Sequence, residues 1–308
     1  MPSYTAPVDD MMFLFEKLRD NKNYNELEKY KEVNSELVKD ILEEAAKINQ
    51  NLILPLAKAG DETPAILENG VVRTPPGYKE AYQKYIEDGW TSLSCDPKYG
   101  GQGMPRTVSA FFDEMMSSSS LAFKLYSELT LGAYNCIHHH ATDEIKDKFL
   151  PKMVQGKWSG TMCLTEPVCG TDLGLLKTKA VEQSDGTYKI SGQKIAVPDG
   201  DIADFAVVSA TSGKNIGLFL VNLKDDKVII ETLDTFDPSR SHANITFDNA
   251  DGMLLEDDAW TSIEKLLDQS AVLFAFEQVG GAEASMNMAK EYAMGRYCLL
   301  YTSPSPRD

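Results

Sequence analysis

The residues best suited to chemistry stand in one short stretch, TMCLTEPVCGTDLG, from Thr161 to Gly174. It brings Thr, Glu, Pro, Gly and Asp together within a few positions. Each of these is a turn residue for its own physical reason, so a plain surface turn is one interpretation. The other is a ligand loop, in which glycine lets the backbone approach closely, hydroxyls form hydrogen bonds and free N–H groups face an anion. Composition alone favours the turn.

The other reactive side chains do not form a recognisable site. His138, His139 and His140 are adjacent, and successive side chains on a helix point about 100° apart, so the three cannot face one ion. The SSSS run from Ser117 to Ser120 favours a joint between helices over a nucleophile. Neither GxSxG nor GxGxxG occurs, so neither a hydrolase nor a Rossmann site is supported. We predict no metal site.

The overall charge limits the partners. Lys and Arg number 30 and Asp and Glu number 47, so the net charge is 30 − 47 = −17. This acidic balance disfavours nucleic acid and anionic lipid as partners. The sequence holds no apolar run of about 18 residues, and its start lacks a basic n-region, so neither a membrane span nor a signal peptide is predicted. Five cysteines without a CxxC pair indicate reduced thiols and a cytoplasmic protein.

The quoted stretch stands where the pattern changes from helices to strands. Apolar residues recur at helical spacing from Val38 to Leu56, and helical patterns return in YKEAYQKYIEDGW, from Arg106 to Ala133, and in ATDEIKDKFLPKMVQG, where Thr142 and Asp143 form an N-cap grouping. The segment between the first two of these helical patterns, GDETPAILENGVVRTPPG, is interpreted as a linker.

Beyond Trp158 the segments are short and rich in β-branched residues, which predicts strands. Without crossover helices they should form an antiparallel barrel or sandwich over 161–257. Near Asp257 the helical period returns. Loops at domain junctions are preferred ligand sites, so the position of the quoted stretch makes the ligand loop as plausible as the turn.

These residues resemble a known family. CLTEPVCGTDLG resembles the flavin-binding signature of the acyl-CoA dehydrogenases, with a small residue, an aliphatic residue, Thr, Glu-Pro and then Gly-Ser/Thr-Asp in order. DPKYGGQGMP, GTYKISGQK, LDTFDPSRSHANITFDNADG and FEQVGGAEASMNMAKEYAMGR resemble further segments of the family, so the likeness covers about 35–297. The N-terminal extension is similar to that of the branch acting on methylthio-substituted acyl-CoAs.

The resemblance implies a helical N-terminal domain, an antiparallel β-barrel or sandwich in the middle and a C-terminal helical bundle. It implies FAD as cofactor, an acyl-CoA substrate oxidised to the 2,3-enoyl-CoA, an electron-transferring flavoprotein as acceptor, and a homo-oligomer. On this basis we expect an extension at 1–37, the helical domain at 38–160, the β domain at 161–257 and the first helices of an incomplete C-terminal domain at 258–297.

The resemblance also assigns roles to single residues. The backbone groups of Met162 and Leu164 would hold the flavin edge, and the Thr165 hydroxyl would lie near flavin N5. Thr171 would bind the FAD pyrophosphate, with a further role at the substrate, and Gly170 would leave room for it. Ala196 and Val197 are assigned to the flavin site by position, although the family usually has an aromatic ring where Ala196 stands.

Two further departures concern the chemistry. The position that carries the catalytic carboxylate in some branches is Ser270, and no motif gives Glu277 that role, so the base is expected beyond Arg296. The last segment, YCLLYTSPSPRD, does not resemble the family, and we expect 298–308 to be a non-native tail and the fragment as written to be inactive. An acyl-CoA oxidase and a non-catalytic flavin- or acyl-CoA-binding protein remain the alternatives.

Overall fold

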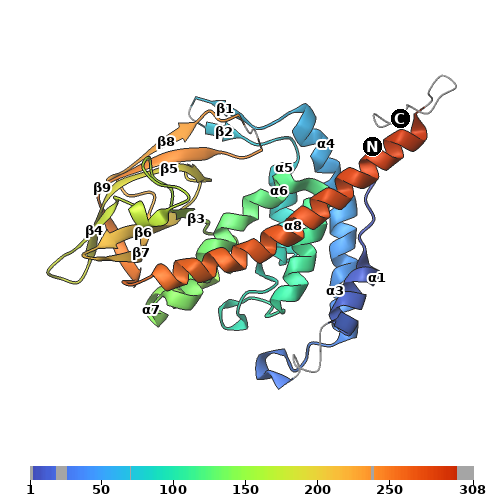
Figure 1. The fold of residues 1–308 in the computed structure, drawn as a ribbon, viewed down its shortest axis with the longest axis horizontal. Helices are drawn as coiled ribbons and strands as arrows, with labels where there is room; N and C mark the ends of the chain where they lie inside the picture. Colours follow the sequence, from blue (N-terminus) through green and yellow to red (C-terminus); the bar gives the residue numbers. More distant parts are fainter. Residues whose placement is uncertain (1–2, 19–25, 70, 237–238, 297–308) are drawn as a thin grey trace, which may run out of the picture.

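The computed structural model describes residues 3–18, 26–69, 71–236 and 239–296, and it places a helical part beside a β part (Figure 1). The first helices are α1 (Val8–Phe13), α3 (Ser35–Ile48) and α4 (Leu54–Glu62). The Asn34 side chain accepts a hydrogen bond from the Leu37 N–H and so caps α3. One face of α3 is buried, as the helical spacing from Val38 predicted. The predicted tail at 298–308 lies outside the described residues.

Three more helices complete the helical part: α5 (Tyr78–Glu87), α6 (Arg106–His140) and α7 (Asp143–Val154). The backbone of α6 leaves the helical conformation at Ser120, with φ −162° and ψ 95°, so α6 consists of two arms. The arms run back along each other, because Arg106 Nη2 lies 2.6 Å from Asn135 Oδ1. The serine run is therefore a joint, as predicted. The Thr142 side chain caps α7, which is also as predicted.

A short hairpin corrects the linker predicted before α5. Strand β1 (Ile66–Glu68) pairs antiparallel with β2 (Val71–Arg73), and Asn69 at the turn adopts a positive φ of 53°. Asparagine tolerates this conformation better than most residues, so the turn is cheap to form. The segment therefore has defined structure rather than serving only as a spacer.

The β part closes on itself. Its strands are β3 (Gly160–Cys163), β4 (Lys179–Glu182), β5 (Tyr188–Pro198), β6 (Phe205–Ser212), β7 (Asn215–Asn222), β8 (Val228–Leu233) and β9 (His242–Glu256). The order β6-β4-β5-β9-β7 returns to β6, which makes a small barrel with β3 and β8 attached. The sheet is mainly antiparallel, as predicted, but β3–β6 and β4–β6 are parallel pairings that were not predicted. The core holds side chains such as Ile190, Phe219 and Ile245.

A single long helix, α8 (Trp260–Gly295), stands where the start of a helical bundle was predicted. It runs from the β part across the helical part (Figure 1). Phe276 packs edge-on against Phe111 of α6, with ring centroids 6.1 Å apart. In the described ranges no helix combines the length and apolar character that crossing a membrane needs.

The contact between α6 and α8 contains a buried acid, Glu114. Burial, with a contribution from Glu283, raises the pKa of Glu114 from 4.5 to about 7. The folded state therefore holds this proton more tightly than the unfolded chain, so stability falls as the pH rises from 4.5 to 7. We expect Glu114→Gln to raise the free energy of unfolding at pH 8 by about 1 kcal/mol, discounted for partial screening, and to have little effect at pH 4.

Urea unfolding of the variant and the parent chain at both pH values measures this difference. Glu182→Gln, at an exposed position on β4, is the control, and it should change stability equally little at pH 4 and pH 8. Equal effects of Glu114→Gln at the two pH values would contradict the prediction.

Candidate functional site

The stretch from Thr161 to Gly174 forms the end of β3 and a tight loop after it. Glu166 and Cys169 exchange two backbone hydrogen bonds of 2.8 and 3.1 Å, which place Pro167 and Val168 at the exposed tip. The Asp172 side chain then accepts a bond from the Gly174 N–H and begins a short 3₁₀ turn. The stretch is thus a turn by geometry, which leaves open what its free groups bind.

A buried ion pair supports this loop from beneath. The Lys194 side chain, on β5, is 0% exposed and that of Glu166 is 2% exposed, and Lys194 Nζ lies 2.8 Å from Glu166 Oε1. Lys194 also donates to the Leu164 carbonyl and to Ser209 Oγ, so all three of its protons are used. Burial alone would raise the pKa of Glu166, but hydrogen bonds from Lys194 and the Lys177 N–H hold it below its ordinary value.

The residues assigned to the cofactor lie at the end of β3, in the loop after it and at the bulge of β5. Thr165, Gly170, Thr171 and Ala196 are exposed, whereas Met162 and Leu164 are half-buried. The Ile195 N–H donates to the Thr165 carbonyl at 3.0 Å and joins the two segments. Among the described residues, the N–H groups of Thr165, Gly170 and Thr171 have no hydrogen-bond partner. Donors and hydroxyls are therefore available for an anionic ligand.

Two of the assigned residues have unexpected surroundings. Val197 is only 2% exposed and packs in the core of the β part, so its side chain does not face a ligand at the surface. Ala196 adopts a positive φ of 48°, and its N–H donates to Asn244 Oδ1. The bulge between Lys194 and Val197 explains both, because it shifts the alternation of the strand by one residue.

The strain at Ala196 gives a direct test. A left-handed backbone disfavours alanine but not glycine, so we expect Ala196→Gly to raise the free energy of unfolding by about 0.5 kcal/mol. The same change at Ala59, inside α4, should lower it by about 1 kcal/mol. Thermal unfolding of both variants would show opposite shifts of the midpoint. A loss of stability at Ala196 as large as that at Ala59 would contradict the left-handed assignment.

The side chains at the two positions considered for a catalytic base both have hydrogen-bond partners. Ser270 Oγ donates to the Leu266 carbonyl one turn earlier in α8. Glu277 Oε2 lies 2.6 Å from Lys124 Nζ, and the Lys124 side chain is 4% exposed. Lys124 also binds Glu128 at 2.9 Å. The sequence did not identify Lys124 as important. Helical spacing alone gives no signal for an ion pair between two helices that are far apart in the sequence.

Two of the three adjacent histidines, His138 and His140, bind different carboxylates. His138 Nε2 lies 2.9 Å from Asp96 Oδ2, and His140 Nδ1 lies 3.1 Å from Glu256 Oε2, on the β part. Within the part of the chain that the structure describes, no three His, Cys, Asp or Glu side chains gather closely enough to hold a metal ion. Burial raises the pKa of the Cys163 thiol to about 12, so it is a poor nucleophile.

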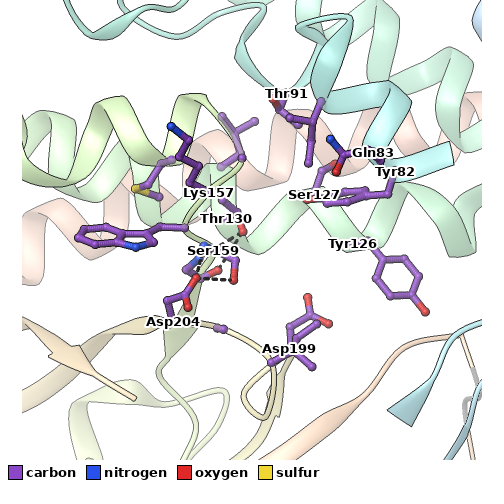
Figure 2. Close-up of a pocket in the computed structure, with 18 of the residues that line it drawn as sticks. Tyr82, Gln83, Thr91, Tyr126, Ser127, Thr130, Lys157, Ser159, Asp199 and Asp204 are labelled. Atoms are coloured by element: carbon purple, nitrogen blue, oxygen red, sulfur yellow. Dashed lines mark hydrogen bonds between the residues drawn. The ribbon is translucent and has the colours of Figure 1, made fainter. Parts of the chain in front are cut away.

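A separate cavity of about 510 Å³ lies between the helical part and the β part (Figure 2). Its walls come from α5, the second arm of α6, the segment before β3 and the loop between β5 and β6. None of the seven residues assigned to the cofactor lines it. This cavity is therefore distinct from the exposed loop after β3.

Comparisons with known proteins identify the family. Residues 35–157 match the model of the N-terminal domain of acyl-CoA dehydrogenases, and residues 161–250 match that of the middle domain. A 3-methylmercaptopropionyl-CoA dehydrogenase from Ruegeria pomeroyi is 41% identical over 199 residues, which cover 65% of this chain and 34% of that protein. The aligned part of the chain therefore spans about a third of this curated relative.

Solved structures agree on the fold. Butyryl-CoA dehydrogenase from Megasphaera elsdenii superimposes with a TM-score of 0.73 at 23% identity, covering 86% of this chain and 70% of that one. A glutaryl-CoA dehydrogenase from Mycobacterium smegmatis, solved in complex with FADH2, gives 0.74 at 17% identity, covering 96% and 71%. The two matched domain models include the Thr161–Gly174 loop and the elements around it. The chain belongs to the acyl-CoA dehydrogenase family.

Proposed function

We propose that this chain is part of a FAD-dependent acyl-CoA dehydrogenase, which converts an acyl-CoA to its 2,3-enoyl-CoA. The observation that carries the proposal is the loop after β3. It lies inside the matched middle domain, and the buried Lys194–Glu166 pair supports it from beneath. Thr165, Gly170 and Thr171 are exposed, and their N–H groups have no hydrogen-bond partner among the described residues. Exposed donors on a rigid support suit a flavin and its pyrophosphate.

The residues of this loop would bind different parts of FAD. The half-buried backbone of Met162 and Leu164 would face the flavin edge, and the Thr165 hydroxyl would orient it. Gly170 and Thr171 would bind the pyrophosphate, since a glycine there leaves the backbone open to close approach. When bound, FAD supplies the acceptor for the β-hydride of the thioester. The α-proton of a thioester is only weakly acidic and requires a positioned base. We assign that role neither to Ser270, whose hydroxyl donates within its own helix, nor to Glu277, which is paired with Lys124.

A FAD titration of the purified chain tests the proposal. We expect flavin fluorescence to be quenched on binding and Gly170→Val to weaken binding at least tenfold. A Cβ at Gly170 would meet no neighbour closer than 3.6 Å, so the fold should tolerate the change. Gly295→Val is the matched control, since nothing lies within 4 Å of a Cβ there. Equal FAD affinity in both variants, or no FAD binding by the parent chain, would overturn the proposal.

The electron acceptor is a second part of the proposal, and we propose an electron-transferring flavoprotein acting with a homo-oligomeric enzyme. After reduction of the FAD-loaded chain with dithionite, slow reoxidation in air and fast reoxidation by that flavoprotein would support it. Fast reoxidation by air alone would instead identify an acyl-CoA oxidase.

A further inference from the structure

The cavity between α5, α6 and the β part contains a buried carboxylate with one free oxygen. Asp199 is 6% exposed, and its Oδ2 accepts a bond of 2.7 Å from Arg240 Nη2. Within the described residues its Oδ1 has no hydrogen-bond partner. Figure 2 shows the carboxylate pointing from its loop into the cavity, toward the side chains on the helices. A buried acceptor without a partner is costly to the fold unless a ligand or water supplies a donor.

The backbone holds Asp199 firmly in this position. Its φ is +56°, a conformation that Asp tolerates better than most residues. Its N–H donates to the Ser241 carbonyl at 3.0 Å, and its own carbonyl accepts from Ile202 and Ala203 at 3.1 and 2.9 Å. These bonds close the loop into a tight turn. The free oxygen is thus part of a preformed wall and not of a mobile side chain.

The rest of the wall suits a positively charged group. Tyr82 and Tyr126 contribute aromatic rings, and Ser127 and Thr130 contribute hydroxyls. Burial, together with the charge of Asp199, raises the pKa of Tyr82 to about 12, so the tyrosine stays a neutral ring beside the acid. Aromatic faces attract cations, and a carboxylate next to them strengthens the attraction.

The charged groups that line the cavity are two carboxylates and two ammonium groups. Asp204 also lines the wall, where its Oδ2 accepts bonds from the N–H and hydroxyl of Ser159. Lys79 and Lys157 line the cavity too, but both are exposed, and Figure 2 shows the Lys157 ammonium directed away from Asp199. Arg240 offsets one of the two carboxylates. The net charge of −17 adds a field that concentrates cations at the protein.

We propose that this cavity is a binding site for a small organic ammonium ion with an apolar body. The ammonium would donate to Asp199 Oδ1 between the rings of Tyr82 and Tyr126, and the body would fill the apolar part of the 510 Å³ space. The volume lies in the ordinary range for small-molecule sites. The site is separate from the loop after β3, so the proposal does not depend on flavin binding.

The test compares three probes that share one body: hexylammonium, hexan-1-ol and hexanoate. Isothermal titration calorimetry with the purified chain should show the lowest Kd for hexylammonium and no detectable binding of hexanoate over the same range. Equal binding of the three probes would overturn the proposal, because it would reflect the apolar body alone. No binding of hexylammonium would overturn it as well.

Two variants locate the binding. Ser127→Phe should lower the affinity for hexylammonium at least tenfold by filling the cavity, which Ser127 lines. Leu121→Phe, exposed on the same helix and outside the cavity, is the matched control and should bind normally. Should Ser127→Phe fail to fold, Asp199→Asn must reduce hexylammonium affinity tenfold and leave that of hexan-1-ol unchanged. Unchanged hexylammonium binding in a folded Ser127→Phe or Asp199→Asn variant would refute the site.

Discussion

Replacing Lys194 with Met is expected to lower the free energy of unfolding by about 3–5 kcal/mol, the cost of removing one partner from a buried ion pair. The Lys194 side chain is fully buried, and its ammonium binds Glu166 Oε1, the Leu164 carbonyl and Ser209 Oγ. Met has a similar length but no charge, so it would leave the Glu166 carboxylate buried with only the two backbone donors of Lys177 and Thr178. Urea unfolding at pH 7 measures the loss.

Lys189 provides the matched control, because it stands on the same strand and pairs with exposed Asp251. Lys189→Met should cost no more than about 1 kcal/mol, since solvent screens an exposed pair. Adding Glu166→Gln to Lys194→Met should recover part of the stability, because the amide oxygen can still accept a backbone bond while the buried charge is gone. Equal losses from Lys194→Met and Lys189→Met would show that the buried pair does not hold the loop.

The same pair explains what the sequence could predict at the candidate site and what it could not. The signature around Glu166 identified the loop, and GQK marked the strand that ends near it. Nothing in the spacing of Glu166 and Lys194 showed that the two side chains meet, because one stands in the loop after β3 and the other on β5, which come together only in the folded barrel. The role of Lys194 beneath the Leu164 carbonyl therefore emerges only from the structure.

In the fold as well, the sequence predicted the local features and not the contacts between distant segments. Helical spacing predicted α3 and α5, and the serine run predicted the joint in α6, because these features depend on residues close in the sequence. The hairpin at 66–73 was missed since its glycines, prolines and acids resemble a linker, although Asn69-Gly70 is a hairpin signal that could have identified it. The parallel pairing of β3 with β6 was not predictable, because local patterns show that a strand forms and not which strand it joins.

The cavity lay entirely outside the sequence prediction. Its polar wall is built from Asp199, Ser127 and Thr130, which come from a loop and a helix far apart in the sequence. None of these belongs to a motif, and each resembles an ordinary turn or helix residue in isolation. Only the meeting of the two domains brings a free carboxylate oxygen beside aromatic rings. A positive φ at Asp199 has no reliable signal in the sequence either.

The second large effect is expected at Gly101, in the turn DPKYGGQGMP that leads into α6. A Cβ on Gly101 would stand 2.2 Å from the Cys95 carbonyl oxygen and 2.3 Å from its carbon, which are backbone atoms that cannot rotate away. The Cys95 carbonyl already accepts a bond from the Gly103 N–H at 2.9 Å, so any shift breaks the turn. We expect Gly101→Ala to lower the free energy of unfolding by about 3 kcal/mol.

Gly186→Ala separates this clash from simple backbone strain. Gly186 has a positive φ of 81° but no atom within 4 Å of a Cβ, so its replacement should cost only about 1 kcal/mol. Urea unfolding of both variants gives the comparison.

The Asp96 N–H donates to the Tyr134 hydroxyl, so the turn also ties the start of α6 to its second arm. Losing that contact should loosen the second arm of α6, which carries Ser127 and Thr130. We therefore expect Gly101→Ala to increase amide hydrogen exchange in this arm. Gly186→Ala should not. A loss no greater at Gly101 than at Gly186 would mean that the turn yields to the added methyl group, and that close packing does not require a glycine at position 101.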